Sequence, residues 1–148
     1  MSKTAGHSVQ RKIVMDTNVL YAALRSRFGA SFQILGSIWD NETKLLLSHT
    51  VLTEYEEILK REAAVLGMTL NEIDQFLDAL CTDAELVLID DFSPLASNDP
   101  DDEPFMRLAL ASRDSFLVTH NRRHFSAIVD IPGIKLLAPK DFLAIIRS

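Results

Sequence analysis

The sequence predicts an α/β protein in which helices cover both faces of a parallel sheet, giving three layers. Short apolar segments alternate along the chain with longer segments of helical periodicity, as expected for strands joined by crossover helices. The short segments are apolar enough to be buried on both faces. The 148 residues suffice for one sizeable core, and no linker, repeat or low-complexity tract interrupts residues 11–148, so we expect a single domain there.

Each predicted strand is a short run of aliphatic or aromatic residues, and each predicted helix repeats apolar residues three or four positions apart. The strands are expected at residues 12–15, 44–48, 86–89, 116–119 and 134–137. The helices are expected at residues 19–24, 30–39, 51–66, 70–80, 105–113 and 140–146. Ser48 or Thr50 can cap the third helix and Thr69 or Asn71 the fourth, while Gly67 is typical of a stop between them.

The composition excludes some classes of protein. Residues 1–10 are small and polar and lack the apolar core of a signal peptide, so a disordered N-terminal arm is expected. No apolar run approaches the roughly twenty residues of a membrane helix. The single cysteine, Cys81, cannot form an internal disulfide, which favours a cytoplasmic protein. A net charge of −6 argues against broad, unspecific binding of nucleic acid.

Three acidic features lie where the predicted elements can bring them together. Asp16 ends the first strand, and carboxyl ends of parallel strands are where open α/β sheets keep their sites. Asp16 can also cap the following helix, unless Thr17 or Asn18 does so. Carboxylates that converge without thiol ligands suit a hard divalent cation, whose usual chemistry is phosphoryl transfer.

The second acidic feature is on the third helix. Its apolar stripe consists of Val51, Leu52, Tyr55, Ile58 and Leu59. Glu54 and Glu56 fall on the two borders of this stripe, and Glu57 points away from it. Periodicity therefore excludes Glu57 and leaves Glu54 and Glu56 open.

The third acidic feature spans residues 99–103. Projected back from the helix that contains Phe105, Asp102 falls on the buried face and Asp101 at its edge, whereas Glu103 and Arg107 face water. A buried carboxylate needs backbone amides, a cation, or both. We therefore expect Asp102 to bind a metal ion, to cap the helix, or to do both.

The fourth predicted strand ends close to Asn121, whose amide oxygen can bind a cation weakly or hold a water molecule. His120 and His124 lie on either side of it. No paired Cys or His spacing supports a zinc site, so zinc is not expected.

These segments, in this order, resemble the PIN-domain family of metal-dependent ribonucleases, and within it the bacterial branch described as toxin components of toxin–antitoxin systems. The resemblance covers residues 12–146. Asp-Thr-Asn-Val at 16–19 is similar to the first motif of the family, Leu-Thr-Glu-Tyr at 52–55 to the second, and residues 99–105 to the third. The family often has a further Asp after the Val-Thr strand, where this chain has Asn121.

The resemblance implies a Rossmann-like sheet of four to five strands in the order 3-2-1-4-5, and endonucleolytic cleavage of RNA with Mg²⁺ or Mn²⁺. It favours Glu54 over Glu56 and implies that Asp16, Glu54 and Asp102 are catalytic. The implied metal ligands are Asp16, Glu54, Asp102 and Asn121, with Asp99 and Glu103 as secondary ligands. The residues expected to hold RNA phosphates are Arg25, Arg27, Arg122 and Arg123. The expected partners are an RNA substrate, an antitoxin protein and a second copy of the chain in a homodimer, with no membrane.

Two other functions compete with this interpretation. Asn121 in place of an acid leaves open a catalytically weak PIN domain that acts as a nucleic-acid- or protein-binding module. A metal-dependent phosphatase on a similar sheet is disfavoured, because Asn18 stands where such an enzyme would have a second Asp.

Overall fold

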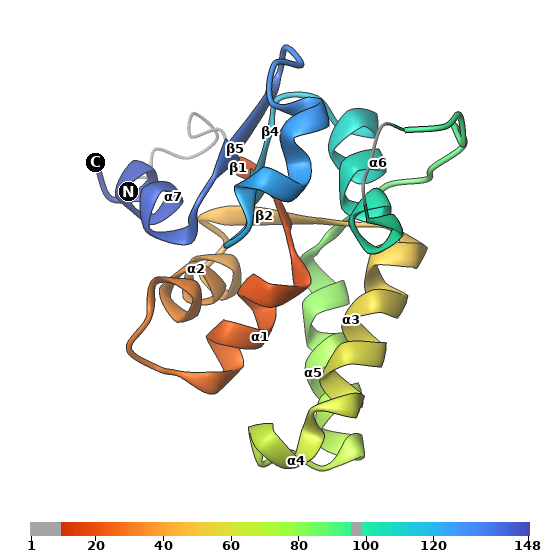
Figure 1. Cartoon of the computed structure of the whole chain (residues 1–148). Helices are drawn as coiled ribbons and strands as arrows, with labels where there is room; N and C mark the ends of the chain where they lie inside the picture. The colour runs from red at the N-terminus through yellow and green to blue at the C-terminus, as the bar shows by residue number, and fades with distance from the viewer. Residues whose placement is uncertain (1–9, 96–98) are drawn as a thin grey trace.

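Five parallel strands form one sheet in the order β3-β2-β1-β4-β5 in the computed structural model, which describes residues 10–95 and 99–148 (Figure 1). The strands are β1 Arg11–Met15, β2 Thr43–Leu47, β3 Glu85–Leu86, β4 Ser115–Val118 and β5 Ile134–Leu137. The predicted strand order is confirmed. The predicted N-terminal arm lies outside the described residues, apart from Gln10.

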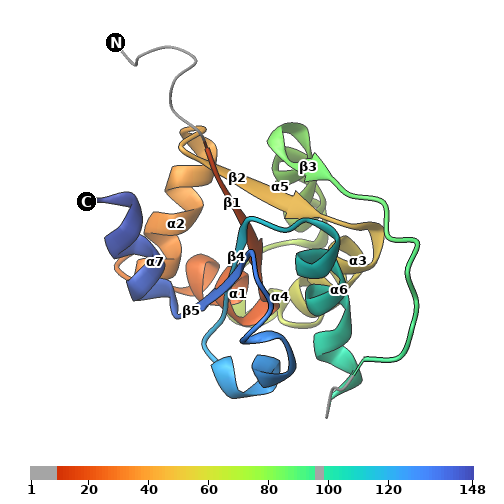
Figure 2. The same ribbon diagram turned by 90° about the horizontal axis from the view of Figure 1, so that it is seen from above.

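Helices cover both faces of this sheet, as predicted. They are α1 Thr17–Arg25, α2 Ala30–Trp39, α3 His49–Arg61, α4 Ala63–Leu66, α5 Leu70–Asp83, α6 Glu103–Ala111 and α7 Pro139–Ile146, with short 3-10 helices η1 Pro100–Asp102 and η2 Arg122–Ile128. In Figure 2, α2 and α7 lie together on one side of the sheet, and α3, α5 and α6 lie on the other. Helix α1 contacts both α2 and α3. Among the described helices, none is long and apolar enough to cross a membrane.

The core lies on both faces of the central strands. Strand β1 pairs in parallel with β2 on one side and with β4 on the other. Ile13, Val14 and Met15 of β1 are fully buried, which explains why this strand is continuously apolar instead of alternating. Burial of each such side chain contributes roughly 1.5–3 kcal/mol. The apolar strand therefore holds the residue that follows it, Asp16, at a fixed place on the edge of the sheet.

Local signals account for the helix ends on this side of the sheet. The Ser48 hydroxyl accepts a 3.2 Å hydrogen bond from the Val51 N–H and begins α3. Thr69 and Glu72 form a reciprocal capping box at the start of α5. Gly67 ends α4 with a φ of 67°, a conformation that glycine adopts without the steric cost of a side chain.

The helix predicted over residues 51–66 is two helices. The chain leaves helical geometry at Glu62, with φ −99° and ψ 15°, between α3 and α4. The apolar spacing continues across this break, so periodicity alone does not reveal it.

The third strand is shorter than the predicted residues 86–89. Its pairing ends where the Val87 N–H donates to the Leu47 carbonyl at 2.8 Å, and the next side chain, Leu88, is 93% exposed. The segment then leaves the sheet.

Arg107 of α6 holds this departing segment, contrary to the prediction that Arg107 faces water. Its guanidinium donates 2.8 Å hydrogen bonds to the carbonyl oxygens of Asp91 and Ser93 and lies over the ring of Phe92. Only 15% of the Arg107 side chain is exposed. Periodicity from α6 alone misplaced Arg107 because the covering segment comes from another part of the chain.

Candidate functional site

Asp16 lies at the carboxyl edge of the sheet, directly after β1. Its backbone N–H donates to the Val118 carbonyl at 3.0 Å, so the pairing of β1 with β4 extends to this residue. Asp16 occupies the N-cap position of α1, but its side chain makes no capping hydrogen bond within the described structure. Instead, its Oδ2 accepts a 2.6 Å hydrogen bond from the hydroxyl of Thr119, which follows β4.

Burial determines the electrostatics of Asp16. The residue is 8% exposed, and this burial raises the pKa of its carboxyl group. The Thr119 hydroxyl and the Thr17 N–H oppose the increase, as do His124 and His120. Asp16 is therefore a carboxylate whose charge is only partly compensated by the protein.

Asp102 is buried, as helix periodicity predicted, while Asp101 is exposed. The Asp99 carboxylate accepts a 2.9 Å hydrogen bond from the Asp101 N–H and caps η1. Asp102 then takes the N-cap position of α6 without a side-chain capping bond in the described structure. Capping therefore does not explain why the Asp102 carboxylate is buried.

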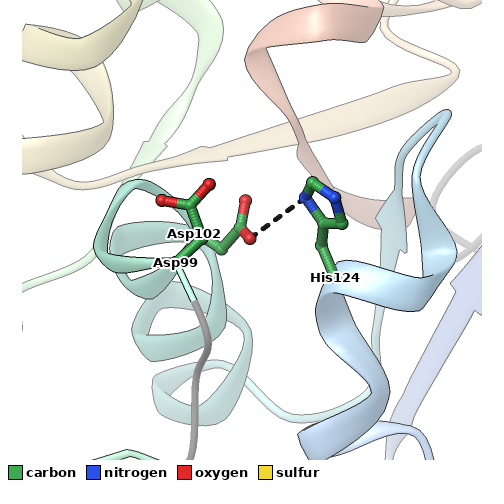
Figure 3. Close-up of side chains that lie close together, drawn as sticks. All are labelled: Asp99, Asp102 and His124. Atoms are coloured by element: carbon green, nitrogen blue, oxygen red, sulfur yellow. Dashed lines mark ion pairs between the residues drawn. The ribbon is translucent and has the colours of Figure 1, made fainter.

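His124 faces Asp102 from the other side of the site. Its Nδ1 lies 3.2 Å from Asp102 Oδ2 (Figure 3). That oxygen is buried, yet it accepts no hydrogen bond from any residue that the structure describes. One atom each from Asp99, Asp102 and His124 can be chosen so that all three lie within 4.8 Å of one another. Two carboxylates and an imidazole at these separations suit a divalent cation.

The short helix η2 positions His124. Phe125 of this helix is fully buried in the core and anchors it. The His124 N–H donates to the Asn121 carbonyl at 3.0 Å, which closes the turn after β4. The His124 side chain stays 48% exposed, so its ring has access to both the carboxylates and solvent.

The pKa of Asp102 is raised to about 6, chiefly because burial disfavours the charged carboxylate. His124 opposes this increase, and the charges of Asp16, Asp99 and Asp101 contribute to it. The other acids of the site therefore add to the effect of burial on Asp102.

Glu54 is half-buried on α3, whereas Glu56 is exposed and pairs with Lys60 at 2.8 Å. Partial burial raises the pKa of Glu54, and the charges of Asp101 and Glu57 add to this effect. The contribution of Asp101 links Glu54 to the acidic segment before α6.

Tyr55 docks α3 against the start of the site. Its side chain is fully buried, and its hydroxyl donates a 2.5 Å hydrogen bond to the carbonyl oxygen of Met15. Because Met15 precedes Asp16 and Tyr55 follows Glu54, this bond fixes the helix that carries Glu54 relative to the strand that carries Asp16.

The expected ligands do not all come together. Asp102 and Asp99 belong to the cluster with His124, which includes neither Asp16 nor Glu54. Glu103 lies 3.6 Å from Arg107 in an ion pair on α6. Asn121 is exposed, and its backbone N–H donates to Thr119 Oγ1 at 3.0 Å.

A groove of about 720 Å³ opens beside His124. Its lining residues are His120, Asn121, Arg122, Arg123, His124, Ser126, Val129 and Leu136. Two of the four expected RNA-binding arginines, Arg122 and Arg123, therefore lie next to the acidic cluster. Arg25 and Arg27 are not among the groove's lining residues: Arg25 ends α1 and stacks on the Tyr21 ring, with its guanidinium carbon 5.7 Å from the ring centroid.

Sequence reasoning missed three residues of this site. The sequence pattern does not pair His124 with Asp102, although His124 follows a strand that ends at the expected edge. Thr119 closes an otherwise apolar strand with a hydroxyl, which is a signal that could have drawn attention to it. The hydrogen bond from Tyr55 to Met15 could not be predicted, because the spacing of Tyr55 marks it only as a member of the apolar stripe.

The fold and this site define a three-layer α/β protein with carboxylates gathered at the carboxyl edge of a parallel sheet. The chain belongs to the PIN-domain family, whose sequence model matches residues 12–123. Among solved structures, it is similar to VapBC2 from Rickettsia felis bound to a DNA fragment from their promoter, with a TM-score of 0.56 and 16% sequence identity, covering 86% of this chain and 98% of that chain. That similarity shows a shared fold. No curated protein sequence matches the chain.

Proposed function

We propose that this PIN domain is a metal-dependent endoribonuclease that acts as the toxin of a toxin–antitoxin pair in the bacterial cytoplasm. The observation that carries the proposal is the Asp102 carboxylate, which is buried beside Asp99 and His124 and has an oxygen that accepts no hydrogen bond from the described residues. Membership of the PIN-domain family and the ordered motifs of the sequence support the same conclusion.

The residues of the site fit a divalent cation such as Mg²⁺ or Mn²⁺. Asp102 Oδ2 is buried without a hydrogen-bond donor among the described residues, and a cation would compensate it. Asp16 and Glu54 complete the set of catalytic acids that we propose, with Asn121 and Glu103 as outer positions. When bound, the cation would supply an electrophile for the scissile phosphate and make a water molecule more acidic.

The side chains of the protein have distinct roles in this proposal. Thr119 donates to one oxygen of Asp16 and so fixes the orientation of that carboxylate toward the site. Glu54, half-buried on α3, would accept a proton from the attacking water. Asp102 and Asp99 would hold the cation at the N-terminal end of α6.

The basic groove provides a place for the RNA backbone. Arg122 and Arg123 are exposed on it, beside the acidic cluster. Arginine binds phosphate through paired N–H donors, so these side chains would hold phosphates that flank the cleaved bond. Arg25 and Arg27 would contact a more distant part of the substrate. A local basic groove reconciles nucleic-acid binding with the net charge of −6.

Cleavage assays test the enzymatic part of the proposal. Purified protein with Mn²⁺ is incubated with an RNA, a DNA of the same sequence and the small phosphoester p-nitrophenyl phosphate, and Asp16→Asn serves as the control. Internal cleavage of RNA alone, lost in Asp16→Asn, supports the ribonuclease. Hydrolysis of only the small ester would favour a phosphatase, and RNA binding without cleavage would favour a binding module.

A growth assay tests the toxin part. Expression of the chain alone should slow bacterial growth, and co-expression of an antitoxin protein should relieve the effect. Asp16→Asn at equal expression should be harmless. Equal toxicity of both forms would contradict catalysis as the cause. Light scattering during purification tests the homodimer that we propose for the free protein.

A further inference from the structure

His124 brings an imidazole nitrogen close to the carboxylates of Asp99 and Asp102. We propose that His124 Nδ1 is a direct metal ligand, together with Asp102 and Asp99, and that it makes the site select Mn²⁺ over Mg²⁺. This inference rests on the proposed metal-dependent function and names the ion that the site takes.

The distances fit a single ion. Ligand atoms bound at about 2.1 Å in octahedral geometry are about 3.0 Å apart when adjacent and about 4.2 Å apart when opposite. His124 Nδ1 and Asp102 Oδ2 are 3.2 Å apart, and the three potential ligand atoms lie within 4.8 Å of one another. The side chains therefore need only small movements to bind one cation.

Two further observations distinguish a ligand from an ordinary ion-pair partner. Asp102 Oδ2 is buried and receives no hydrogen bond from the described residues, so the His124 ring is close to it without donating a well-aligned N–H. The anchoring of η2 by the buried Phe125 holds the ring at this place, while the His124 side chain stays 48% exposed. Nδ1 can bind a cation when the ring is neutral and carries its proton on Nε2.

The composition of the ligand set favours the metal that we name. Two carboxylates balance the charge of a divalent ion, and the imidazole is a neutral ligand. Mg²⁺ and Mn²⁺ both accept carboxylate and water oxygens, but an imidazole nitrogen binds a first-row transition ion better than Mg²⁺. His124 is therefore the group that would separate the two ions.

Binding measurements on the full chain test this inference without using RNA. Mn²⁺ and Mg²⁺ are titrated by calorimetry into the wild type, His124→Ala, His124→Asp and His120→Ala. His120 is a matched control, because it is an exposed histidine that lines the same groove but is not part of the cluster. Pulsed EPR of bound Mn²⁺ then detects a directly coordinated histidine nitrogen.

The wild type should bind Mn²⁺ at least about tenfold more tightly than Mg²⁺. His124→Ala should lose most of this preference and the nitrogen signal, whereas His120→Ala should keep both. His124→Asp, which restores an oxygen ligand, should bind metal with the preference shifted toward Mg²⁺ and without the nitrogen signal. Thermal melting checks that each variant is folded, and His124→Asp keeps the test decisive if His124→Ala does not fold.

An unchanged Mn²⁺ preference and nitrogen signal in a folded His124 variant would overturn the inference, even if the wild type cleaves RNA. Conversely, loss of the Mn²⁺ preference and of the nitrogen signal in the His124 variants supports the inference even if the wild type cleaves no RNA. In that case only the proposed ribonuclease activity is wrong.

Discussion

The hydroxyl of Thr119 donates a 2.6 Å hydrogen bond to Oδ2 of Asp16, across 103 positions of the sequence. The same hydroxyl oxygen accepts a 3.0 Å hydrogen bond from the backbone N–H of Asn121. One buried side chain therefore joins the end of β1 to the turn that leads into η2 and His124.

Thr119→Val should impair the site while leaving the fold intact, because valine has the same shape but no hydroxyl. Without the hydrogen bond, the Asp16 carboxylate loses its fixed orientation and its pKa rises further. We expect RNA cleavage and Mn²⁺ affinity to fall by about 10–100-fold, the usual effect of removing a group that orients a metal-site carboxylate. Thr119→Ser keeps the hydroxyl and should retain most activity. Equal activity of both variants would show that this hydrogen bond is only structural.

Asp102→Asn and Asp101→Asn provide a matched pair at the start of α6. Asp102 is 7% exposed and lies beside His124, whereas Asp101 is exposed. Asp102→Asn should remove most RNA cleavage and, without metal, stabilise the fold by about 2 kcal/mol at neutral pH because a buried charge is lost. Asp101→Asn should retain most activity. Urea unfolding and cleavage are measured on both, and loss of activity in Asp101→Asn alone would contradict the assignment.

The metal-free protein should become more stable as the pH is lowered from about 7 to about 5. The pKa of Asp102 is raised from 3.8 to about 6 on folding, so the folded state binds more protons than the unfolded state between these values. The charged Asp102 carboxylate therefore lowers the free energy of unfolding above pH 6. Protonation of this carboxylate at lower pH removes that loss of stability. The gain should be about 1 kcal/mol larger in the wild type than in Asp102→Asn. If the free energy of unfolding changes with pH in the same way in both proteins, the pKa of Asp102 is not raised on folding and the prediction is wrong.

Most of the fold could be predicted from the sequence because the information is local. Apolar strands such as Ile13-Val14-Met15 and periodic helices appear directly in the pattern, and the strand order followed from the family resemblance. The errors have two causes. Arg107 is covered by the segment that leaves β3, which lies elsewhere in the chain. The break at Glu62 is not visible in the sequence because the apolar spacing continues across it.

Less of the candidate site than of the fold could be predicted from the sequence. Burial of Asp102 follows from the periodicity of α6, because the side chain belongs to a regular element. The position of His124 depends on η2, a 3-10 helix with a kink at Phe125, which has no periodic signal. The Thr119–Asp16 bond depends on the register in which β1 and β4 pair, which the sequence pattern does not specify.

Asn121→Asp tests the position where the PIN family often has a further acid. Asn121 is exposed, and its backbone N–H, which a substitution retains, holds Thr119. If its side chain reaches the cation, a carboxylate there should lower the Mn²⁺ concentration for half-maximal cleavage by about tenfold, with some loss of metal-free stability. Activity is measured over a Mn²⁺ titration for both forms. An unchanged requirement would place residue 121 outside the coordination sphere.

RNA cleavage before and after removal of metal is the most direct test of the proposed function. The purified wild type and Asp102→Asn are treated with excess EDTA, assayed on RNA, and assayed again after Mn²⁺ is added beyond the chelator. We predict that EDTA abolishes cleavage by the wild type, that Mn²⁺ restores it, and that Asp102→Asn remains inactive throughout. Undiminished cleavage by the wild type in excess EDTA would contradict a metal-dependent ribonuclease.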